Sequence, residues 1–328
     1  MIFVTGANGF IGRHVVEALR ASGEAFRVLL SRPNAEFSAR FPDVDTVCGD
    51  LLDAGTLDRG LEGVRGVIHL ASKNIDHDGS GFERINVEGT RLLAERAAAH
   101  GIERLVYVSS VGIYGHGAHR GADESTPVAP DTPFSRSKAA AEESLLQSHR
   151  TGEFGVTILR HRFVYGVGDR AVMPRLIKAA KKYPFWISGG KATMSLVWAG
   201  DLAEVARRFA VGAVPASPED APIFHITDGR TTTYREVITT LCDLFDFTPP
   251  RFSVPFTALY LPVRAREVLL GIDPEVSQAS ITSIRLKLVA QDNDFSSQKL
   301  QKALGEYSFV SLAEGLEKSL EDYRQFAV

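Results

Sequence analysis

The sequence contains few cysteines, little net charge and no long hydrophobic run. Only Cys48 and Cys242 occur among 328 residues, which excludes a scaffold held together by disulfides. The 37 basic and 40 acidic residues give a net charge of −3, so we expect no nucleic-acid partner. The charge-free apolar stretch at 252–263 has 12 residues, whereas a spanning helix needs about 20. We therefore expect no membrane span.

What is present is typical of a folded protein. Apolar residues make up 44% of the chain, which excludes a disordered protein. At about 150 residues per domain, the length predicts two domains. Met1 leads into Ile-Phe-Val-Thr-Gly with neither a basic region nor a cleavage site, so we expect no targeting segment and a cytoplasmic location.

The first half of the chain alternates short β-rich runs with helical patterns. The predicted strands are 2–4, 26–30, 67–70, 105–108 and 156–159. The helical patterns between them include 11–21, 87–100 and 135–148. Strands separated by helices predict right-handed βαβ units. We therefore predict an α/β protein with a doubly wound parallel sheet, whose ligand binds at the carboxyl ends of the strands.

The second half is less regular. Residues 195–198 and 223–226 are predicted strands that return to the sheet, and helices are predicted over 233–245 and 311–326. These segments predict a smaller, mostly helical domain whose parts interleave with the first. The expected division is 1–165 plus 195–228 for a nucleotide-binding domain, and 166–194 plus 229–328 for a substrate-binding domain.

The glycines cluster first at Gly6, Gly9 and Gly12, between a predicted strand and a predicted helix. Gly6 and Gly9 permit a tight turn and close approach of the backbone to a pyrophosphate. Gly12 lets the helix pack on the strand, and the helix N-terminus supplies N–H groups and a partial positive charge. The pattern predicts a dinucleotide site, against the alternative of an ordinary glycine turn.

Further motifs follow along the whole chain. They are Gly49-Asp50-Leu51, Val67-Ile68-His69-Leu70-Ala71, Asn86-Val87-Glu88-Gly89-Thr90, Val108-Ser109-Ser110 with Tyr114-Gly115, Tyr165-Gly166, Asp201-Leu202-Ala203 and Ser311-Leu312-Ala313. Together with the glycine spacing, they resemble the extended branch of the short-chain dehydrogenase/reductase superfamily. That branch includes sugar-nucleotide epimerases and dehydratases, dihydroflavonol reductases and 3β-hydroxysteroid dehydrogenases. The resemblance implies a Rossmann-type sheet, a small-molecule substrate and a homodimer.

The resemblance also implies a set of cofactor-binding residues. They are Gly6, Asn8, Gly9, Phe10, Ile11, Gly12, Arg32, Asp50, Leu51, Leu70, Ala71, Ser72 and Lys138. Members that prefer NAD usually carry an acid after the second strand, where this chain has Ser31 and Arg32. A guanidinium can pair with a 2′-phosphate, so we expect NADP(H), with NAD(H) as the alternative. The structural alternative is that Arg32 only begins a solvated loop.

The family's catalytic set is incomplete here. The resemblance implies that Ser110 bonds the carbonyl oxygen and that Lys138 holds the nicotinamide ribose. The position of the general acid, a tyrosine in the family, holds Phe134, which cannot exchange a proton. Loss of a general acid typically costs about 10²–10⁴-fold in rate.

Three explanations of Phe134 stay open. The protein is a natural variant that uses another group or water, it has lost catalysis and kept the cofactor, or Phe134 is an introduced Tyr→Phe change. Tyr114 is a candidate substitute donor, although its motif suggests a structural or substrate-lining role.

The expected function is that of an NADP(H)-dependent oxidoreductase acting on a carbonyl or secondary alcohol, with impaired or altered proton transfer. Phe185, Trp186 and the stretch 252–263 favour an apolar substrate. The alternatives are a nucleotide-sugar epimerase or dehydratase, and a non-catalytic NADP-binding sensor or assembly subunit. His116 and His119 have no third ligand of evident spacing, so we expect no metal site.

A basic set follows Pro174. It comprises Arg175, Lys178, Lys181 and Lys182. A solvated helix face explains this set better than contact with a substrate phosphate.

Overall fold

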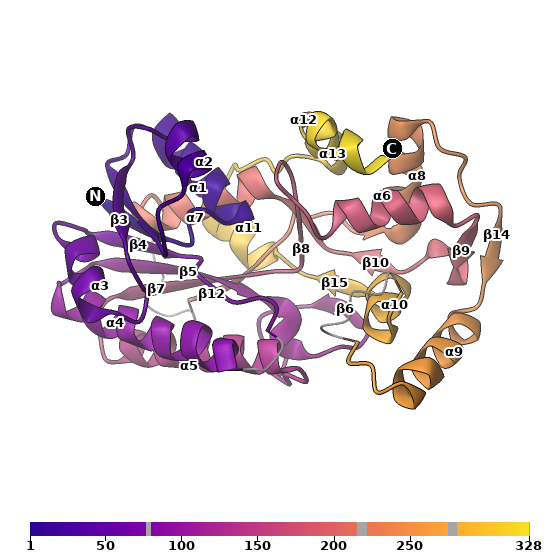
Figure 1. The fold of residues 1–328 in the computed structure, drawn as a ribbon, viewed down its shortest axis with the longest axis horizontal. Helices are drawn as coiled ribbons and strands as arrows, with labels where there is room; N and C mark the ends of the chain where they lie inside the picture. Colours follow the sequence, from indigo (N-terminus) through magenta and orange to yellow (C-terminus); the bar gives the residue numbers. More distant parts are fainter. Residues whose placement is uncertain (77–79, 215–221, 275–280, 328) are drawn as a thin grey trace.

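The computed structural model describes residues 1–76, 80–214, 222–274 and 281–327, and its largest element is a seven-stranded parallel sheet. The strand order is β12-β7-β5-β4-β1-β2-β3, so the chain starts inside the sheet and winds outward in both directions (Figure 1). The strands are β1 (Ile2–Thr5), β2 (Phe26–Leu30), β3 (Asp45–Cys48), β4 (Gly66–His69), β5 (Arg104–Ser110), β7 (Gly155–His161) and β12 (Ile223–Ile226). This arrangement is a Rossmann-like α/β fold, which confirms the predicted class.

Helices cover both faces of this sheet (Figure 1). One face packs against α1 (Phe10–Ala21) and α7 (Ala199–Ala210), and the other against α3 (Ala54–Leu61), α4 (Gly89–Ala99) and α5 (Pro133–Arg150). Successive side chains of a strand point to opposite faces, so Val4 joins the first core and Phe3 the second. Because both faces are buried at the centre of the sheet, β1 and β4 are buried along their whole length and mostly apolar, whereas the edge strand β3 is largely exposed.

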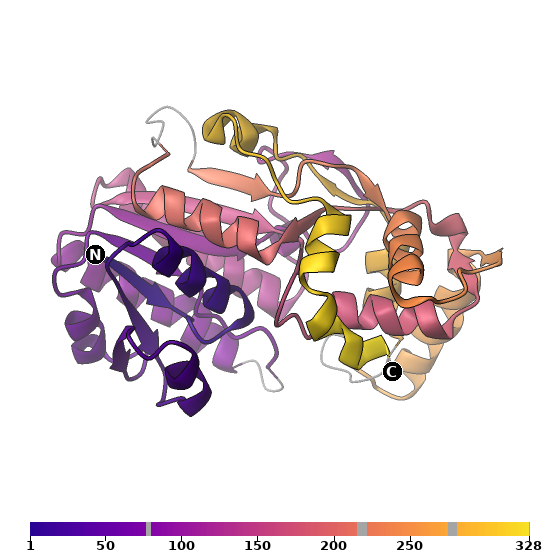
Figure 2. The same ribbon diagram turned by 90° about the horizontal axis from the view of Figure 1, so that it is seen from above.

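The remaining elements lie mostly to one side of the large sheet (Figures 1 and 2). The strands are β6 (His119–Ala122), β8 (Phe163–Tyr165), β9 (Phe185–Ile187), β10 (Thr193–Met194), β11 (Leu196–Trp198), β13 (Thr232–Thr233), β14 (Phe252–Val254) and β15 (Asn293–Phe295). The helices are α2 (Ala35–Arg40), α6 (Met173–Lys182), α8 (Tyr234–Phe245), α9 (Phe256–Leu269), α10 (Ser283–Ala290), α11 (Gln298–Leu304), α12 (Leu312–Lys318) and α13 (Leu320–Ala327). Many of them surround a separate apolar core that includes Tyr165, Leu241 and Tyr323.

The strand predicted at 195–198 forms, but its predicted place in the large sheet is wrong. β11 pairs with β8 in a two-stranded sheet, whereas β12 joins the large sheet beside β7, as predicted. The reason is that β7 and β8 are separated at Arg162, after which the chain leaves the large sheet. β11 therefore pairs with β8, outside the large sheet, and not with β7.

The single helix predicted over 311–326 is instead two helices, α12 and α13, which are separated at Ser319. The Ser319 hydroxyl donates a hydrogen bond to the carbonyl oxygen of Gly315, 2.8 Å away. A serine that bonds back along its own helix competes with the backbone and favours a bend. No helix in the part of the chain that the structure describes is both long enough and apolar enough to cross a membrane.

The turn from β1 into α1 has no room for side chains at two glycines. Gly6 has a φ of 73°, and a Cβ built there would lie 2.6 Å from the backbone nitrogen of Ala71. A Cβ on Gly12 would lie 2.1 Å from the carbonyl oxygen of Gly6. The first helix therefore packs on the first strand only because both positions are glycine.

This packing predicts different effects of alanine at two helical glycines. We expect Gly12→Ala to lower the free energy of unfolding by at least about 2 kcal/mol, because backbone atoms must move. Gly55→Ala in α3 is the control, since its Cβ would lie 3.7 Å from the nearest atom, an oxygen of Asp53. It should leave the free energy unchanged or raise it by up to about 1 kcal/mol. Urea unfolding measures both, and equal effects would contradict the close approach at Gly12.

Candidate active site

A cavity of about 870 Å³ lies at the carboxyl ends of the central strands, where the strand order reverses between β1 and β4. The predicted cofactor-binding residues that line it are Gly6, Asn8, Gly9, Phe10, Ile11, Gly12, Asp50, Leu51, Leu70, Ala71, Ser72 and Lys138. Arg32 is not among the lining residues. It is exposed and follows Ser31, which does line the cavity.

The N-terminus of α1 opens into this cavity. Gly9 is the N-cap residue, and no side chain caps the helix. The first N–H groups of the helix are therefore open to an anion. Arg13 braces the turn by donating to the side-chain oxygen of Asn8 at 3.1 Å, and its guanidinium also lies 2.6 Å from a carboxylate oxygen of Glu36.

A second wall of the cavity is fixed by Asn86, which sits in the π-helical turn Phe82–Glu88 and is 1% exposed. Its side-chain oxygen accepts from the backbone nitrogen of Lys73 at 2.7 Å, and its amide donates to the hydroxyl of Ser137 at 2.9 Å. Asn86 therefore ties the loop that follows β4 to α5. The sequence marks Asn86 only as part of a motif and gives no signal of this positioning role.

The three positions of the predicted catalytic set come together at the cavity. Ser110 ends β5, while Phe134 and Lys138 lie one turn apart at the start of α5, and all three line the cavity. The Ser110 oxygen accepts a hydrogen bond from the backbone nitrogen of Gly112 at 3.1 Å. The ring of Phe134 contacts the ring of Phe82 edge to face, with centroids 6.0 Å apart.

Lys138 is buried, with 3% of its surface exposed. Its ammonium donates to the carbonyl oxygen of Val108 at 2.9 Å and lies 4.1 Å from the centroid of the Tyr107 ring. Burial lowers the pKa of Lys138 to about 7, against the opposing effect of the Glu142 charge. The site therefore holds a lysine that loses its proton much more readily than an exposed one.

A buried polar network connects α5 to β5 and β7. Arg160 and Glu142 are 3% and 4% exposed and form an ion pair with a shortest distance of 2.5 Å. Ser109 donates to the same carboxylate, and Arg160 donates to the hydroxyl of Tyr114 at 2.5 Å. The hydroxyl also bonds Nε2 of His225 at 2.7 Å, and burial raises the pKa of Tyr114 to about 12. Tyr114 does not line the cavity, which favours its structural role over that of a substitute donor.

Among the lining residues that the predicted set lacks are two titratable ones, His161 and Arg162. Burial lowers the pKa of His161 to about 4, so its ring is neutral at pH 7. Arg162 donates to the side-chain oxygen of Asn293 at 2.6 Å, and burial lowers its pKa to about 10. Both residues lie where β7 ends and the chain leaves the large sheet. No pattern in the sequence indicates that the chain leaves the sheet at this point.

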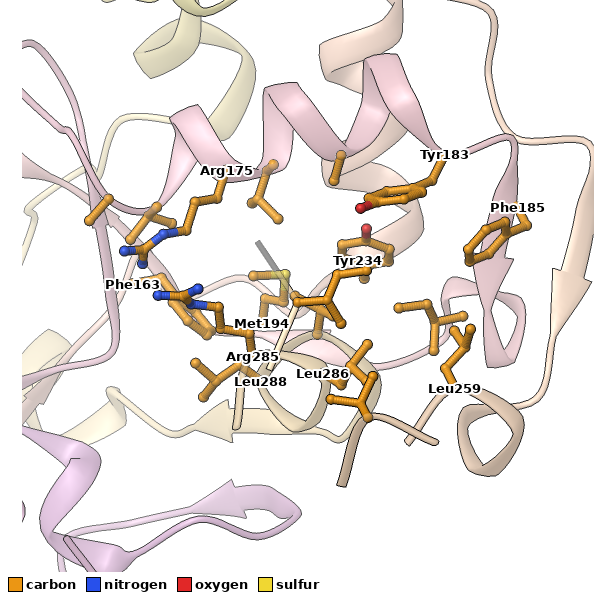
Figure 3. Close-up of a pocket in the computed structure, with 18 residues that line it drawn as sticks. Phe163, Arg175, Tyr183, Phe185, Met194, Tyr234, Leu259, Arg285, Leu286 and Leu288 are labelled. Atoms are coloured by element: carbon orange, nitrogen blue, oxygen red, sulfur yellow. The ribbon is translucent and has the colours of Figure 1, made fainter. Parts of the chain in front are cut away.

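A second, smaller cavity of about 200 Å³ adjoins the first, and Ala171 and Val172 line both. Its walls are mainly apolar and come from α6, α8, α9 and α10 (Figure 3). Labelled lining residues are Phe163, Tyr183, Phe185, Met194, Tyr234, Leu259, Leu286 and Leu288. Of the residues that favour an apolar substrate in the sequence, Phe185, Leu259 and Val263 line this cavity, whereas Trp186 does not and is instead buried in the neighbouring apolar core.

Two arginines, Arg175 and Arg285, lie together at one end of the smaller cavity (Figure 3). Burial and then the charge of Arg175 lower the pKa of Arg285. Lys178, Lys181 and Lys182 are exposed, as expected for a solvated helix face, but Arg175 is a wall of the cavity. The sequence pattern does not separate Arg175 from its basic neighbours.

The segment that separates the two cavities is held by Asp169, which is 1% exposed. Its carboxylate accepts from the backbone nitrogens of Ala171, Val172 and Met173 at 2.7–2.9 Å. Tyr323 of α13 bonds the same carboxylate at 3.4 Å. Within the described residues, no group of three or more His, Cys, Asp or Glu side chains is arranged to hold a metal.

Comparison with known proteins gives a consistent result. Residues 2–216 match the model of the NAD dependent epimerase/dehydratase family. A ketoreductase from Stigmatella aurantiaca, which acts on 4-hydroxy-2-methyl-3-oxo-4-farnesyl-3,4-dihydroquinoline-1-oxide, is 28% identical over 96% of this chain and 94% of its own. The human decarboxylating sterol-4-alpha-carboxylate 3-dehydrogenase is 25% identical over 98% of this chain and 87% of its own. The crystal structure of gox2253 covers 99% of this chain and 98% of its own, with a TM-score of 0.77 and 24% identity.

The buried Lys138 predicts a pH dependence of stability in the absence of nucleotide. Its pKa is about 7 in the folded protein and about 10.4 when unfolded, so between these values the unfolded state binds more protons. The contribution of Lys138 to stability therefore rises with pH in this window and is constant below it. We expect the free energy of unfolding of the parent, minus that of Lys138→Met, to increase between pH 7 and pH 9.

Urea unfolding at several pH values measures this difference. The control is Lys302→Met on the exposed surface of α11, for which the difference should stay flat. Parallel curves for the parent and Lys138→Met would contradict the lowered pKa.

Proposed function

The chain belongs to the NAD dependent epimerase/dehydratase family, and from that premise we propose that it is an NADP(H)-dependent oxidoreductase acting on a carbonyl or secondary alcohol of an apolar substrate. The observation that carries this proposal is the shared wall between two cavities. One contains Ser110 and Lys138, and the other is lined mainly by apolar side chains. The ketoreductase and sterol dehydrogenase named above support carbonyl chemistry on apolar molecules.

The residues of the larger cavity fit a dinucleotide. Gly6 and Gly12 keep side chains out of the turn, and the uncapped start of α1 offers N–H groups to a pyrophosphate. In this proposal 1–165 plus 195–228 bind the nucleotide, while 166–194 plus 229–328 bind the substrate. β11 falls in the first set by sequence, although it pairs with β8 outside the large sheet. The homodimer and the cytoplasmic location expected from the sequence remain predictions.

When bound, the nicotinamide supplies or accepts the hydride. Ser110 then donates a hydrogen bond to the substrate oxygen, and the charge of Lys138 favours negative charge on that oxygen. The buried ion pair of Glu142 and Arg160 keeps α5, and with it Lys138, in place. The apolar walls of the smaller cavity bury the body of the substrate and exclude water from the reacting atoms.

Proton transfer is the altered step in this proposal, because Phe134 occupies the place of the general acid. The ring lines the cavity but has no proton to give. Another group or water must then supply the proton, and Lys138 is a candidate because burial makes it more acidic than an ordinary lysine. A non-catalytic NADP-binding protein is the second candidate function, and Phe134 is the observation that favours it.

Restoring the hydroxyl at position 134 tests the proposal. We expect Phe134→Tyr to raise turnover by about 10²-fold or more, because it adds a general acid beside Ser110 and Lys138. Phe134→Leu is the control, since it keeps the position apolar and should not raise turnover. NADPH oxidation is measured with a panel of apolar ketones, and interconversion of UDP-hexoses is followed in parallel.

Each outcome of this assay separates the candidates. Reduction of apolar ketones that rises in the Phe134→Tyr protein supports the oxidoreductase. Equal turnover by the parent and the Phe134→Tyr protein contradicts impaired proton transfer. Sugar interconversion without ketone reduction favours an epimerase, and NADPH binding without turnover in either protein favours the non-catalytic function.

Cofactor preference is a separate prediction. Arg32 is exposed beside Ser31 at the rim of the cavity, and a hydrogen bond to a charged group contributes about 1.5–3 kcal/mol. We therefore expect Arg32→Ala to weaken NADPH binding by about 10–100-fold and NADH binding by less than about twofold. Calorimetric titration measures both, with Arg91→Ala on α4 as the control. An equal loss for both nucleotides would contradict the assignment of the 2′-phosphate to Arg32.

A further inference from the structure

The exposed large apolar side chains are concentrated in one segment. Of eight such side chains among the described residues, five lie between residues 252 and 270. They are Phe252, Leu261, Val268, Leu269 and Leu270, and their exposed fractions run from 56% to 83%. Single exposed apolar residues are normal on a soluble protein, but a contiguous group indicates a contact surface.

Helix α9 carries three of these five residues, with Leu270 directly after its end and Phe252 in β14, and the helix is apolar on two opposite faces. Its inner face contributes Leu259 and Val263 to the smaller cavity. Its outer face presents Leu261, Val268 and Leu269, which are spaced i, i+7 and i+8 and therefore share one side of the helix. A helix that only covered the cavity would present polar residues outward. The outer face is therefore suited to an apolar environment.

The charges around this face are positive. Arg264 and Arg266 are exposed and lie on the two sides of the outer apolar stripe, and Arg251 precedes β14. Between residues 247 and 272 the one carboxylate is Glu267. That carboxylate is 3% exposed and accepts a hydrogen bond from the backbone nitrogen of Ser283 at 2.7 Å. It also lies 3.5 Å from the guanidinium of Arg264, so it compensates part of that charge, whereas no carboxylate is paired with Arg251 or Arg266 among the ion pairs of the described residues. The surface therefore offers apolar side chains and arginines to its partner, with no exposed acid among them.

We propose that α9 and Phe252 bind the surface of an anionic lipid membrane, with α9 lying in the plane of the interface. An apolar stripe flanked by arginines is the pattern of helices that insert between lipid headgroups and acyl chains. With 14 residues, α9 is too short to span a bilayer. Figure 1 shows α9 and β14 at the end of the molecule away from the large sheet, where a flat surface has access to them.

A second copy of the chain fits this surface less well. In a two-fold dimer the same patch would face itself, so arginines of one copy would approach those of the other. Anionic headgroups instead neutralise Arg251 and Arg266, together with the part of the Arg264 charge that Glu267 leaves uncompensated. The membrane is therefore the occupant that the charges favour.

The position of α9 also gives membrane binding a consequence for substrate supply. The inner face of the helix is a wall of the apolar cavity, so a membrane-bound protein would hold that cavity next to lipid. This consequence rests on the proposed function, because it requires an apolar substrate. The binding itself rests only on the outer face of α9.

Co-sedimentation of the full-length protein with vesicles tests the proposal without nucleotide or turnover. The vesicles consist of phosphatidylcholine alone or of phosphatidylcholine with phosphatidylglycerol. We expect binding to the anionic vesicles that weakens at high salt, because the Debye length falls to about 3 Å at 1 M. Leu261→Ser combined with Leu269→Ser should weaken binding by at least about tenfold. Arg264→Gln combined with Arg266→Gln should weaken it by about fivefold for each charge removed.

The controls remove comparable groups elsewhere. Val128→Ser removes an apolar side chain that is 49% exposed, and Arg91→Gln with Arg136→Gln removes two exposed arginines. All variants change exposed residues, and thermal unfolding verifies that each is folded. Binding that is absent from anionic vesicles, or that the α9 variants and the controls weaken equally, overturns the proposal. So does a dimer that the leucine variant dissociates without any vesicle binding, because the face would then join two copies.

Discussion

The geometry of the candidate active site depends on one buried ion pair, between Glu142 of α5 and Arg160 of β7. Lys138 lies one helical turn before Glu142 on α5. The ion pair that anchors Glu142 therefore also fixes the position of Lys138 in the wall of the cavity. On β5, Ser109 donates a hydrogen bond to the same carboxylate, and the neighbouring Ser110 lines the cavity. Removing one partner of such a pair typically costs about 3–5 kcal/mol, since it leaves a buried charge without compensation.

This support has a chemical consequence at Phe134. The network is complete without a hydroxyl at that position, and the ring packs against Phe82. The fold therefore accommodates phenylalanine, whereas in the proposed function this residue leaves the site without the general acid that the family resemblance implies. The lysine that would lower the pKa of a tyrosine is still present and buried, and burial lowers the pKa of Lys138 itself to about 7. In the proposed function the site thus keeps the buried lysine and needs another source of the proton.

The sequence predicted those parts of the site that depend on local geometry. Gly6 and Gly12 follow from the needs of one turn, and Ser110 and Lys138 each lie within a short recognisable motif. What it missed depends on contacts between distant segments. β11 lies outside the large sheet because it pairs with β8, which has already left that sheet. Arg175 forms part of the wall of the smaller cavity because the fold places it near Arg285. Neither relation has a periodicity or spacing along the chain that would reveal it.

The two cavities meet at a segment that no catalytic motif contains. The carboxylate of Asp169 accepts hydrogen bonds from the backbone nitrogens of Ala171 and Val172. These bonds fix the position of the two residues, which line both cavities. Tyr323, close to the end of the described chain, bonds the same carboxylate and the backbone of Gly166. The boundary between the two cavities is therefore held in part by the C-terminal helix α13. In the proposed function, the walls from α9 and α10 can accommodate a change of substrate size without displacing the glycine turn or Lys138, because these line only the larger cavity.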